Sequence, residues 1–308
     1  MRISRRKFFK ISAVTGAVSI IGKSKSTSVA RNFSGRPDRL GVLTDSTRCV
    51  GCRTCEAACN EINKLPKPKI PFEDQSVFEK ERRADSTYYT YVNRYPHPDK
   101  KGKWIYRKVQ CNHCDEPACA SACLVAALKK KPEGPVVWNE KICIGCRYCM
   151  TACPFYVPAF EYSNPYSPDI VKCTMCYDTR VSKGGIPACV EACPMEAMTF
   201  GKRSELIKVA RKRIMEHTDK YVDHIYGENE AGGTCWLYIS GVPFEELGFP
   251  TDVGTKPYPE LTKGFLTMVP AVLVIWPALL GGFYMFTKHR EQLIEEEEKT
   301  PEKKEDRK

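Results

Sequence analysis

The sequence lacks the side-chain combinations on which acyl transfer, phosphoryl transfer and paired-carboxylate chemistry depend. It has no serine–histidine–aspartate arrangement, no phosphate-binding loop and no distinctive pair of carboxylates. Residues 1–30 contain no acidic side chain but seven lysines and arginines. Without this segment and the mixed-charge residues from 288 onward, the formal net charge of +11 falls to about +5, with no basic stripe. Nucleic-acid binding and catalysis on this chain are therefore both disfavoured.

Charge is also absent near the carboxyl end, from Phe265 to Phe286. As a helix this run would span about 33 Å, at about 1.5 Å per residue, which is enough to cross a bilayer core. A buried core helix is the alternative, but core helices seldom run so far without a polar face. We therefore expect a transmembrane helix over residues 263–287, with kinks at Pro270 and Pro277. Basic residues follow it at once, which predicts a charged cytoplasmic tail over residues 288–308. Its end, "EEEEKTPEKKEDRK", is expected to be solvated and disordered.

The amino terminus has the order of an export signal. The string "SRRKFFK" at residues 4–10 matches the twin-arginine motif. A weakly apolar run follows, and then small residues that end at Ala30 and suit cleavage. A basic helix at the membrane surface is the alternative. We expect residues 1–30 to be a twin-arginine signal peptide and residues 31–262 to form a periplasmic domain.

The chain has 17 cysteines, and 16 of them fall into four groups of four. The groups are Cys49, Cys52, Cys55 and Cys59; Cys111, Cys114, Cys119 and Cys123; Cys143, Cys146, Cys149 and Cys153; and Cys173, Cys176, Cys189 and Cys193. The first and third groups have the C-x2-C-x2-C-x3-C spacing of bacterial ferredoxins. Three thiolates on such a tight loop can hold three corners of an iron–sulfur cube. The fourth, expected in the first turn of a helix, then points to a neighbouring cluster.

Two other uses of these cysteines fit less well. Zinc binds four thiolates from pairs of C-x2-C, which leaves the third cysteine of each ferredoxin-type loop unexplained. Disulfides come with more varied spacing, and thiols three residues apart on a tight loop rarely pair. Four [4Fe-4S] clusters use all 16 thiolates, so they are the predicted cofactors, and a zinc-bound exported scaffold is the remote alternative. Cluster loading is coupled to folding in the reducing cytoplasm, and the twin-arginine route carries folded proteins.

The cysteine groups are internal repeats. "CVGCRTCEAAC" and "CIGCRYCMTAC" are identical at seven of eleven positions, and "PACASACLVAAL" resembles "PACVEACPMEAM". The predicted fold is α+β, a duplicated two-[4Fe-4S] ferredoxin-like core with a β-rich insertion at about residues 60–110. Two strands are expected in "STYYTYVNRYPHPDKKGKWIYRKVQ", where ordinary strand alternation is favoured over a partner surface, and a short strand in "GPVVWNEKICIGC". Residues 203–217 predict an amphipathic helix with Ser204 at its start and a solvated basic face.

The order of the four groups resembles that of the four-cluster electron-transfer subunits of the dimethyl sulfoxide reductase and formate dehydrogenase type. The strings "DSTRCVGCRTCEAACNEIN", "ICIGCRYCMTACPFYVP" and "GGTCWLYISGVPFEELGFP" resemble the membrane-anchored ferredoxin-type subunit of hydrogenase-2, and the likeness covers nearly the whole chain. The resemblance implies how the thiolates are shared. Cluster 1 would take Cys49, Cys52, Cys55 and Cys193; cluster 2 Cys173, Cys176, Cys189 and Cys59; cluster 3 Cys111, Cys114, Cys119 and Cys153; and cluster 4 Cys143, Cys146, Cys149 and Cys123.

The same resemblance implies a non-catalytic electron relay. Its partners would be the small and large subunits of a periplasmic nickel–iron hydrogenase and a quinone-reactive integral membrane subunit. The alternative is the same relay in a formate dehydrogenase or another molybdopterin oxidoreductase. Two residues fall outside the ligand sets. We expect His113 to lie at the surface or behind the ligands, and Cys235 to be a buried thiol on a strand.

Overall fold

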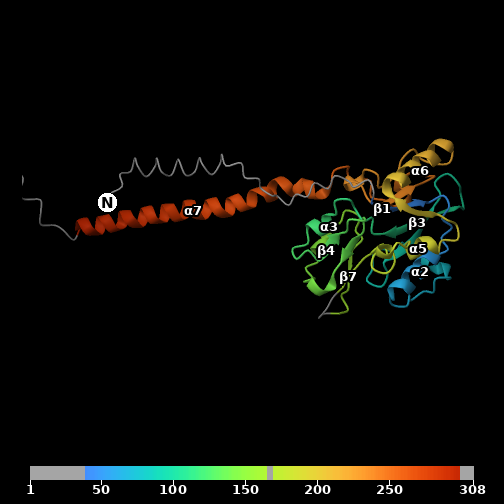
Figure 1. Cartoon of the computed structure of the whole chain (residues 1–308), viewed down its shortest axis with the longest axis horizontal. Helices are drawn as coiled ribbons and strands as arrows, with labels where there is room; N and C mark the ends of the chain where they lie inside the picture. The colour runs from blue at the N-terminus through green and yellow to red at the C-terminus, as the bar shows by residue number, and fades with distance from the viewer. Residues whose placement is uncertain (1–38, 165–168, 299–308) are drawn as a thin grey trace, which may run out of the picture. The chain divides into compact units, whose positions relative to one another are not determined.

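The computed structural model describes residues 39–164 and 169–298 (Figure 1). The predicted signal peptide lies outside these residues, as does the end of the tail from residue 299. Strands and helices alternate along the domain. The strands are β1 (Leu40–Asp45), β2 (Thr90–Pro96), β3 (Trp104–Gln110), β4 (Leu128–Lys130), β5 (Val136–Trp138), β6 (Ala159–Phe160), β7 (Ile170–Val171), β8 (Met198–Lys202) and β9 (Trp236–Ile239). The α-helices are α2 (Thr54–Asn63), α3 (Ala118–Ser121), α4 (Tyr148–Thr151), α5 (Ala188–Glu191), α6 (Arg203–Glu216) and α7 (Tyr258–Glu298).

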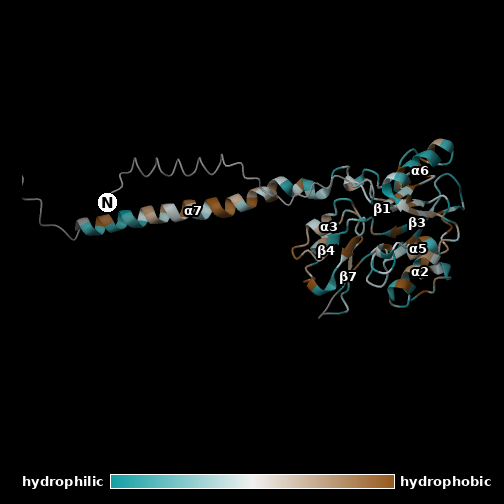
Figure 2. Cartoon of the chain, in the orientation of Figure 1, coloured by the Kyte–Doolittle hydropathy of each residue, from teal (hydrophilic) through white to brown (hydrophobic). Residues whose placement is uncertain are grey.

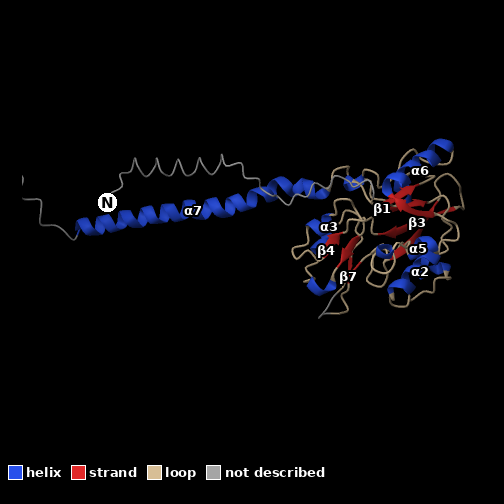
Figure 3. Cartoon of the chain, viewed as in Figure 1, coloured by secondary structure: helices blue, strands red, loops and turns tan. Residues whose placement is uncertain are grey.

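One three-stranded sheet joins distant parts of the chain, in the order β8-β1-β9 (Figure 3). β1 pairs antiparallel with β8 and parallel with β9, where Val42 lies opposite Trp236. Val42 and Leu43 of β1 are completely buried. One face of the sheet packs against α6, in an apolar cluster that contains Leu43, Leu206 and Ile239. The first strand of the domain is thus fixed between two strands that come more than 150 residues later.

The helix predicted over residues 203–217 is confirmed as α6. Leu206, Ala210 and Ile214 recur at four-residue intervals on its buried face, while Lys208 and Lys212 on the opposite face are exposed, as expected. The predicted range begins where the helix does, at Arg203, but the role of Ser204 at its start is wrong. Lys202 is the N-cap, and no side chain caps the helix.

The two strands predicted in the tyrosine-rich segment form the antiparallel hairpin β2–β3, from Thr90 opposite Gln110 to Pro96 opposite Trp104. The expected in–out alternation is absent from the first half of β2, because Thr90, Tyr91, Val92 and Asn93 are all buried. The hairpin therefore inserts one end into the core, while Trp104 near its turn is half exposed. The strand predicted ahead of the third cysteine group is confirmed as β5, which pairs with β4.

The charge-free segment lies within one helix, α7, which runs through both Pro270 and Pro277. Residues 258–296 form a candidate membrane span with a mean hydropathy of 1.9 over its most apolar window, and none of that window is buried within the chain. Figure 2 shows the hydrophobic band in the middle of α7 between hydrophilic ends. This composition fits a single-pass anchor. The charged tail begins as a continuation of α7, and the four glutamates predicted to be disordered are instead helical as far as Glu298, since "EQLIEEEE" consists of good helix formers. The rest of the predicted disordered string lies outside the described residues.

Candidate metal centres

A helix begins at the third cysteine of each of the four groups. Cys55, Cys119, Cys149 and Cys189 are the second residues of α2, α3, α4 and α5. The prediction that the fourth cysteine occupies the first turn is therefore wrong, because the third does. The fourth cysteine lies well inside α2 at Cys59 and just beyond the end of the short helices at Cys123, Cys153 and Cys193. This spacing separates the fourth sulfur from the first three.

The loops before α2 and α4 turn back on themselves through left-handed residues. Gly51 and Gly145 have φ of 71° and 66°, and Arg53 and Arg147, directly before the helices, have 62° and 60°. Successive turns of this kind direct backbone N–H groups to one side, where they attract anions. The N–H of Gly51 bonds to the sulfur of Cys49 and lowers its pKa. Glycine is required here for a second reason, since a Cβ at Gly51 would lie 2.2 Å from the ring of Tyr106.

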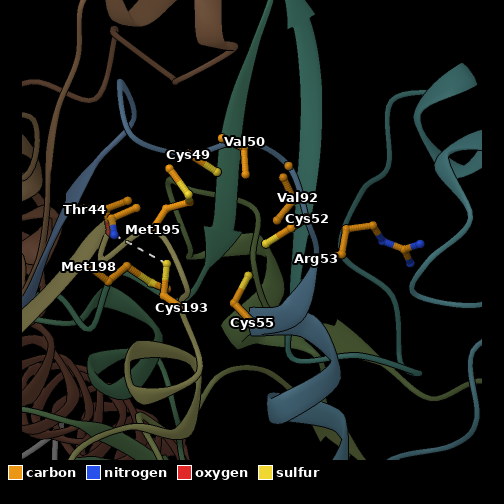
Figure 4. Close-up of a pocket in the computed structure, with 12 residues that line it drawn as sticks. Thr44, Cys49, Val50, Cys52, Arg53, Cys55, Val92, Cys193, Met195 and Met198 are labelled. Carbon is orange, nitrogen blue, oxygen red and sulfur yellow. Dashed lines mark hydrogen bonds between the residues drawn. The ribbon is translucent and has the colours of Figure 1, made fainter.

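The first set of thiols surrounds one cavity, which we call site 1. Cys49, Cys52, Cys55 and Cys193 line it, and Figure 4 shows their sulfurs directed toward a common space. The Arg53 side chain points away from that space in the same view. It donates to the carbonyl oxygens of Pro71 and Asp74 instead. Site 1 is therefore lined by sulfur and apolar groups, with no carboxylate among its lining residues.

The structure brings the other three predicted sets together in the same way. Site 2 is a cavity lined by Cys59, Cys173, Cys176 and Cys189. Site 4 is a cavity lined by Cys123, Cys143, Cys146 and Cys149. At site 3, the thiol of Cys114 has three thiols as its main electrostatic neighbours, those of Cys153, Cys111 and Cys119. In each set, three thiols from one group thus meet the fourth thiol of another group.

The donor sets can be compared with two kinds of metal centre. Among the residues that the structure describes, no group of three cysteine, histidine, aspartate or glutamate side chains is placed to hold a single metal ion. A zinc ion would need four sulfurs at about 2.3 Å. Four thiols around one cavity, with N–H groups directed at sulfur, suit a [4Fe-4S] cluster. The donor sets therefore fit the predicted cofactor better than zinc.

Electrostatic interactions between thiols of different sites indicate a linear order of the sites. Cys55 of site 1 interacts electrostatically with Cys189 of site 2. Cys173 of site 2 interacts with Cys111 of site 3, and Cys119 of site 3 with Cys149 of site 4. The two exposed cysteines are Cys52 in site 1 and Cys146 in site 4. The sites thus follow the order 1-2-3-4, with solvent access at both ends.

Burial is the main influence on the pKa of the thiols in the metal-free chain. It raises the pKa of Cys149 to about 11 and that of Cys173 to about 12, and it raises those of Cys55, Cys59 and Cys114 as well. Backbone N–H groups oppose this effect in part, for example that of Met175 at Cys173. Such thiols are protonated at neutral pH. A cationic metal must displace their protons as it binds.

The fourth thiol of each group receives a hydrogen bond from the residue four positions later. Ala127 N donates to Cys123 Sγ at 3.1 Å, and Ala197 N to Cys193 Sγ at 3.4 Å. At Cys59 the donor is different, because helix α2 continues beyond this residue as far as Asn63. There the side chain of Asn63 is the donor, with Nδ2 3.5 Å from Cys59 Sγ and 2.8 Å from Cys59 O. One site thus depends on an amide side chain where others use the backbone.

Two residues outside the ligand sets lie deeper than their sequence context indicates. His113 is fully buried, so the surface position allowed for it is wrong. Its Nδ1 accepts from Val136 N at 2.9 Å, and burial together with Lys172 holds its pKa well below the usual range. Cys235 is fully buried, as expected, but directly before β9, and Lys130 Nζ lies 3.2 Å from its sulfur. It lines none of the three cavities.

The sequence reasoning missed two buried lysines, Lys108 and Lys172, each only 3 % exposed. Lys108 lines site 2. Lys172 directly precedes Cys173. A lysine beside a cysteine loop gives no signal of burial in the sequence, because the segments that cover both residues come from elsewhere in the chain.

The chain matches a family described as a 4Fe-4S dicluster domain over residues 102–203. It is 50 % identical over 304 residues to a protein of Nitratidesulfovibrio vulgaris, covering 96 % of this chain and 80 % of that protein. It is 36 % identical over 281 residues to the hydrogenase-2 operon protein HybA of Escherichia coli O157:H7, covering 80 % of this chain and 84 % of the relative. Identity to the iron–sulfur subunit of nitrate-inducible formate dehydrogenase from Escherichia coli K12 is 32 % over 262 residues, covering 82 % and 87 %.

The fold and the cysteine sites define a ferredoxin-type protein that binds [4Fe-4S] clusters. The chain belongs to the family of electron-transfer iron–sulfur subunits that includes the hydrogenase-2 and molybdopterin oxidoreductase proteins.

Proposed function

We propose that this chain relays electrons through four [4Fe-4S] clusters between a periplasmic nickel–iron hydrogenase and a quinone-reactive integral membrane subunit. The observation that carries the proposal is the linear order of four sites, each with four thiols and with exposed cysteines at the two ends. The ligands would be the four sets of the sequence prediction. The duplicated ferredoxin-like core would supply two sites from each half.

Each part of the chain has a role in such a relay. A bound [4Fe-4S] cluster supplies one-electron transfer. The cysteine loops hold and orient the four groups, and their N–H donors stabilise negative charge on sulfur. At site 2 all four cysteines are buried, so the chain excludes water from the middle of the path. Cys52 and Cys146 bring the end sites to the surface, where partner subunits could dock.

Helix α7 and the predicted signal peptide would determine where in the cell the relay lies. Helix α7 would hold the domain at the periplasmic face of the cytoplasmic membrane, with the carboxyl terminus in the cytoplasm, as its flanking charges favour. The twin-arginine signal would export the loaded, folded chain. Identity to the hydrogenase-2 relative over most of the chain favours a hydrogenase partner.

A formate dehydrogenase or another molybdopterin oxidoreductase is the second candidate partner. The formate dehydrogenase relative matches a similar share of this chain at 32 % identity. A subunit of the anaerobic dimethyl sulfoxide reductase from Escherichia coli K12 is 40 % identical, but over 55 % of this chain. Nothing in the cysteine sites separates the partners, since a relay does not touch the substrate.

Purification of the complex tests both parts of the proposal. The tagged full chain is solubilised from membranes, and its iron and its companion subunits are identified. We expect about 16 irons per chain, four for each [4Fe-4S] cluster, together with hydrogenase subunits and an integral membrane subunit. A molybdopterin subunit in their place would favour the second candidate. A chain with zinc and without dithionite-bleachable absorbance would defeat the relay.

A further inference from the structure

Lys108 is a buried cation whose hydrogen-bond partners are all uncharged. It lies on β3, 3 % exposed, and its Nζ donates to Thr90 Oγ1 at 2.8 Å and Gln110 Oε1 at 3.0 Å. The ring of Trp236 lies 4.7 Å from the same nitrogen. Among residues 39–164 and 169–298, no carboxylate lies within ion-pair distance of Lys108. A charge buried in this way is costly unless an anion compensates it.

Lys172 repeats the arrangement beside the other central site. It is also 3 % exposed, and its Nζ donates to the carbonyl oxygens of Val136 and Cys173. The part of the chain that the structure describes offers it no carboxylate either. Val136 packs in the same buried cluster as Cys119 of site 3, so the Lys172 ammonium group lies beside that site.

The other cations near the sites are already paired. Arg53 and Arg82 share Glu56. Lys130 lies 3.9 Å from the Asp115 carboxylate, which Arg203 also approaches to 3.7 Å. Arg180, near Cys176, pairs with Glu191 at the surface. Lys108 and Lys172 are thus the buried lysines whose charge faces sulfur without a carboxylate in between.

The sulfurs nearest to Lys108 belong to the predicted ligands of site 2. Lys108 lines the same cavity as Cys59, Cys173 and Cys189. A cluster with four thiolates carries net negative charge, which becomes more negative on reduction. A fixed positive charge beside it therefore favours the reduced state.

We propose that Lys108 and Lys172 are counter-charges built into the two central sites, and that they raise the reduction potentials of clusters at sites 2 and 3. This inference rests on the proposed function, because it requires clusters at those sites. The end site 4 has no such lysine among its lining residues.

The test is a redox titration of the purified full chain, followed by electron paramagnetic resonance. In Lys108→Met, one cluster signal should become harder to reduce by at least tenfold in its oxidised-to-reduced ratio at a fixed potential, which is 59 mV for one electron. Lys172→Met should move a different signal in the same direction. Lys108→Arg keeps the charge and should stay close to the wild type. Lys103→Met is the matched control, because Lys103 is exposed and precedes the same strand.

A further variant keeps the lysine and neutralises it. Gln110→Glu places a carboxylate where Gln110 Oε1 already accepts from Lys108 Nζ. It should therefore shift the same cluster signal as Lys108→Met. This variant provides the test if Lys108→Met does not fold. Unshifted signals in Gln110→Glu and in the iron-loaded methionine variants would overturn the inference. A wild-type chain without four cluster signals would instead refute the proposed function.

Discussion

The domain has two halves, each with two of the four cysteine sites, and the halves cover their thiols differently. Residues 49–59 and 173–193 form sites 1 and 2, where α2 packs against α5; residues 111–153 form sites 3 and 4, where α3 packs against α4. All four thiols of site 2 are buried, whereas Cys146 of site 4 is exposed. The cover of site 2 includes Tyr89 and Trp236, from outside the cysteine groups. Solvent access is thus decided by these added segments and not by the cysteine spacing.

The halves also differ in the helix that carries the third thiol. α2 has ten residues and contains Cys59, while α3, α4 and α5 have four residues each and end before the fourth thiol. The longer helix removes the backbone donor that other fourth thiols receive, and Asn63 replaces it. The fourth cysteine thus follows the third by the same spacing in every group, but its surroundings differ.

The largest expected effect comes from breaking a set of thiols that joins two groups. Cys193→Ala should abolish the same cluster signal as Cys49→Ala, because both thiols line site 1. Cys189→Ala and Cys59→Ala should together identify a different signal, that of site 2. Each variant should lose about 4 of about 16 irons, measured by iron analysis and electron paramagnetic resonance.

Cys235→Ala is the matched control for these variants. Cys235 is buried like most of the ligand thiols but lines none of the three cavities, so all iron should remain. The sharing of thiols between groups would be refuted if Cys193→Ala and Cys189→Ala removed the same signal.

A smaller effect is expected at the buried carboxylate of the first half. Glu56 accepts two hydrogen bonds from Arg82, at 2.6 and 2.9 Å, and one from Val92 N at 2.8 Å. Glu56→Gln would leave Arg53 and Arg82 without their shared anion. We expect a loss of about 3–5 kcal/mol in the free energy of unfolding, measured by denaturant unfolding of the purified chain.

The matched control is Glu191→Gln, which removes a carboxylate from a surface pair with Arg180. A loss of less than about 1 kcal/mol is expected there. Equal losses in the two variants would show that burial of the Glu56 cluster does not stabilise the first half.

Local patterns predicted local elements well. The alternation and turn residues between Thr90 and Gln110 predicted the hairpin, and the apolar spacing from Leu206 to Ile214 predicted α6. The capping residue of α6 was missed because serine is a preferred capping residue by type, yet the extended strand β8 runs directly into the helix at Lys202. The position of the third thiol at each helix start was missed for a related reason. Left-handed residues such as Arg53 end the loop earlier than the spacing indicates.

The surroundings of the sites could not be predicted in this way. Lys108 stands in "YRKVQC" between residues typical of an exposed strand. It is buried because Thr90, Trp236 and the thiol of Cys189 converge on it from three distant segments. His113 is likewise enclosed by Val136 and Lys172. Sequence spacing therefore identified the candidate ligands, while the charges and donors that act on them depend on tertiary contacts. That the 16 cysteines are ligands stays a prediction.

The smallest expected effect tests the donor that distinguishes α2. Asn63→Leu removes the N–H group 3.5 Å from Cys59 Sγ. A hydrogen bond to sulfur stabilises the reduced, more negative cluster, so its loss should make site 2 harder to reduce. About 1 kcal/mol is expected for one such bond, or about a fivefold change in the oxidised-to-reduced ratio, less than for Lys108→Met. Asn60→Leu is the control, since its amide donates to Pro66 O. An equal shift in both variants would mean that α2, and not the donor, sets the difference between the halves.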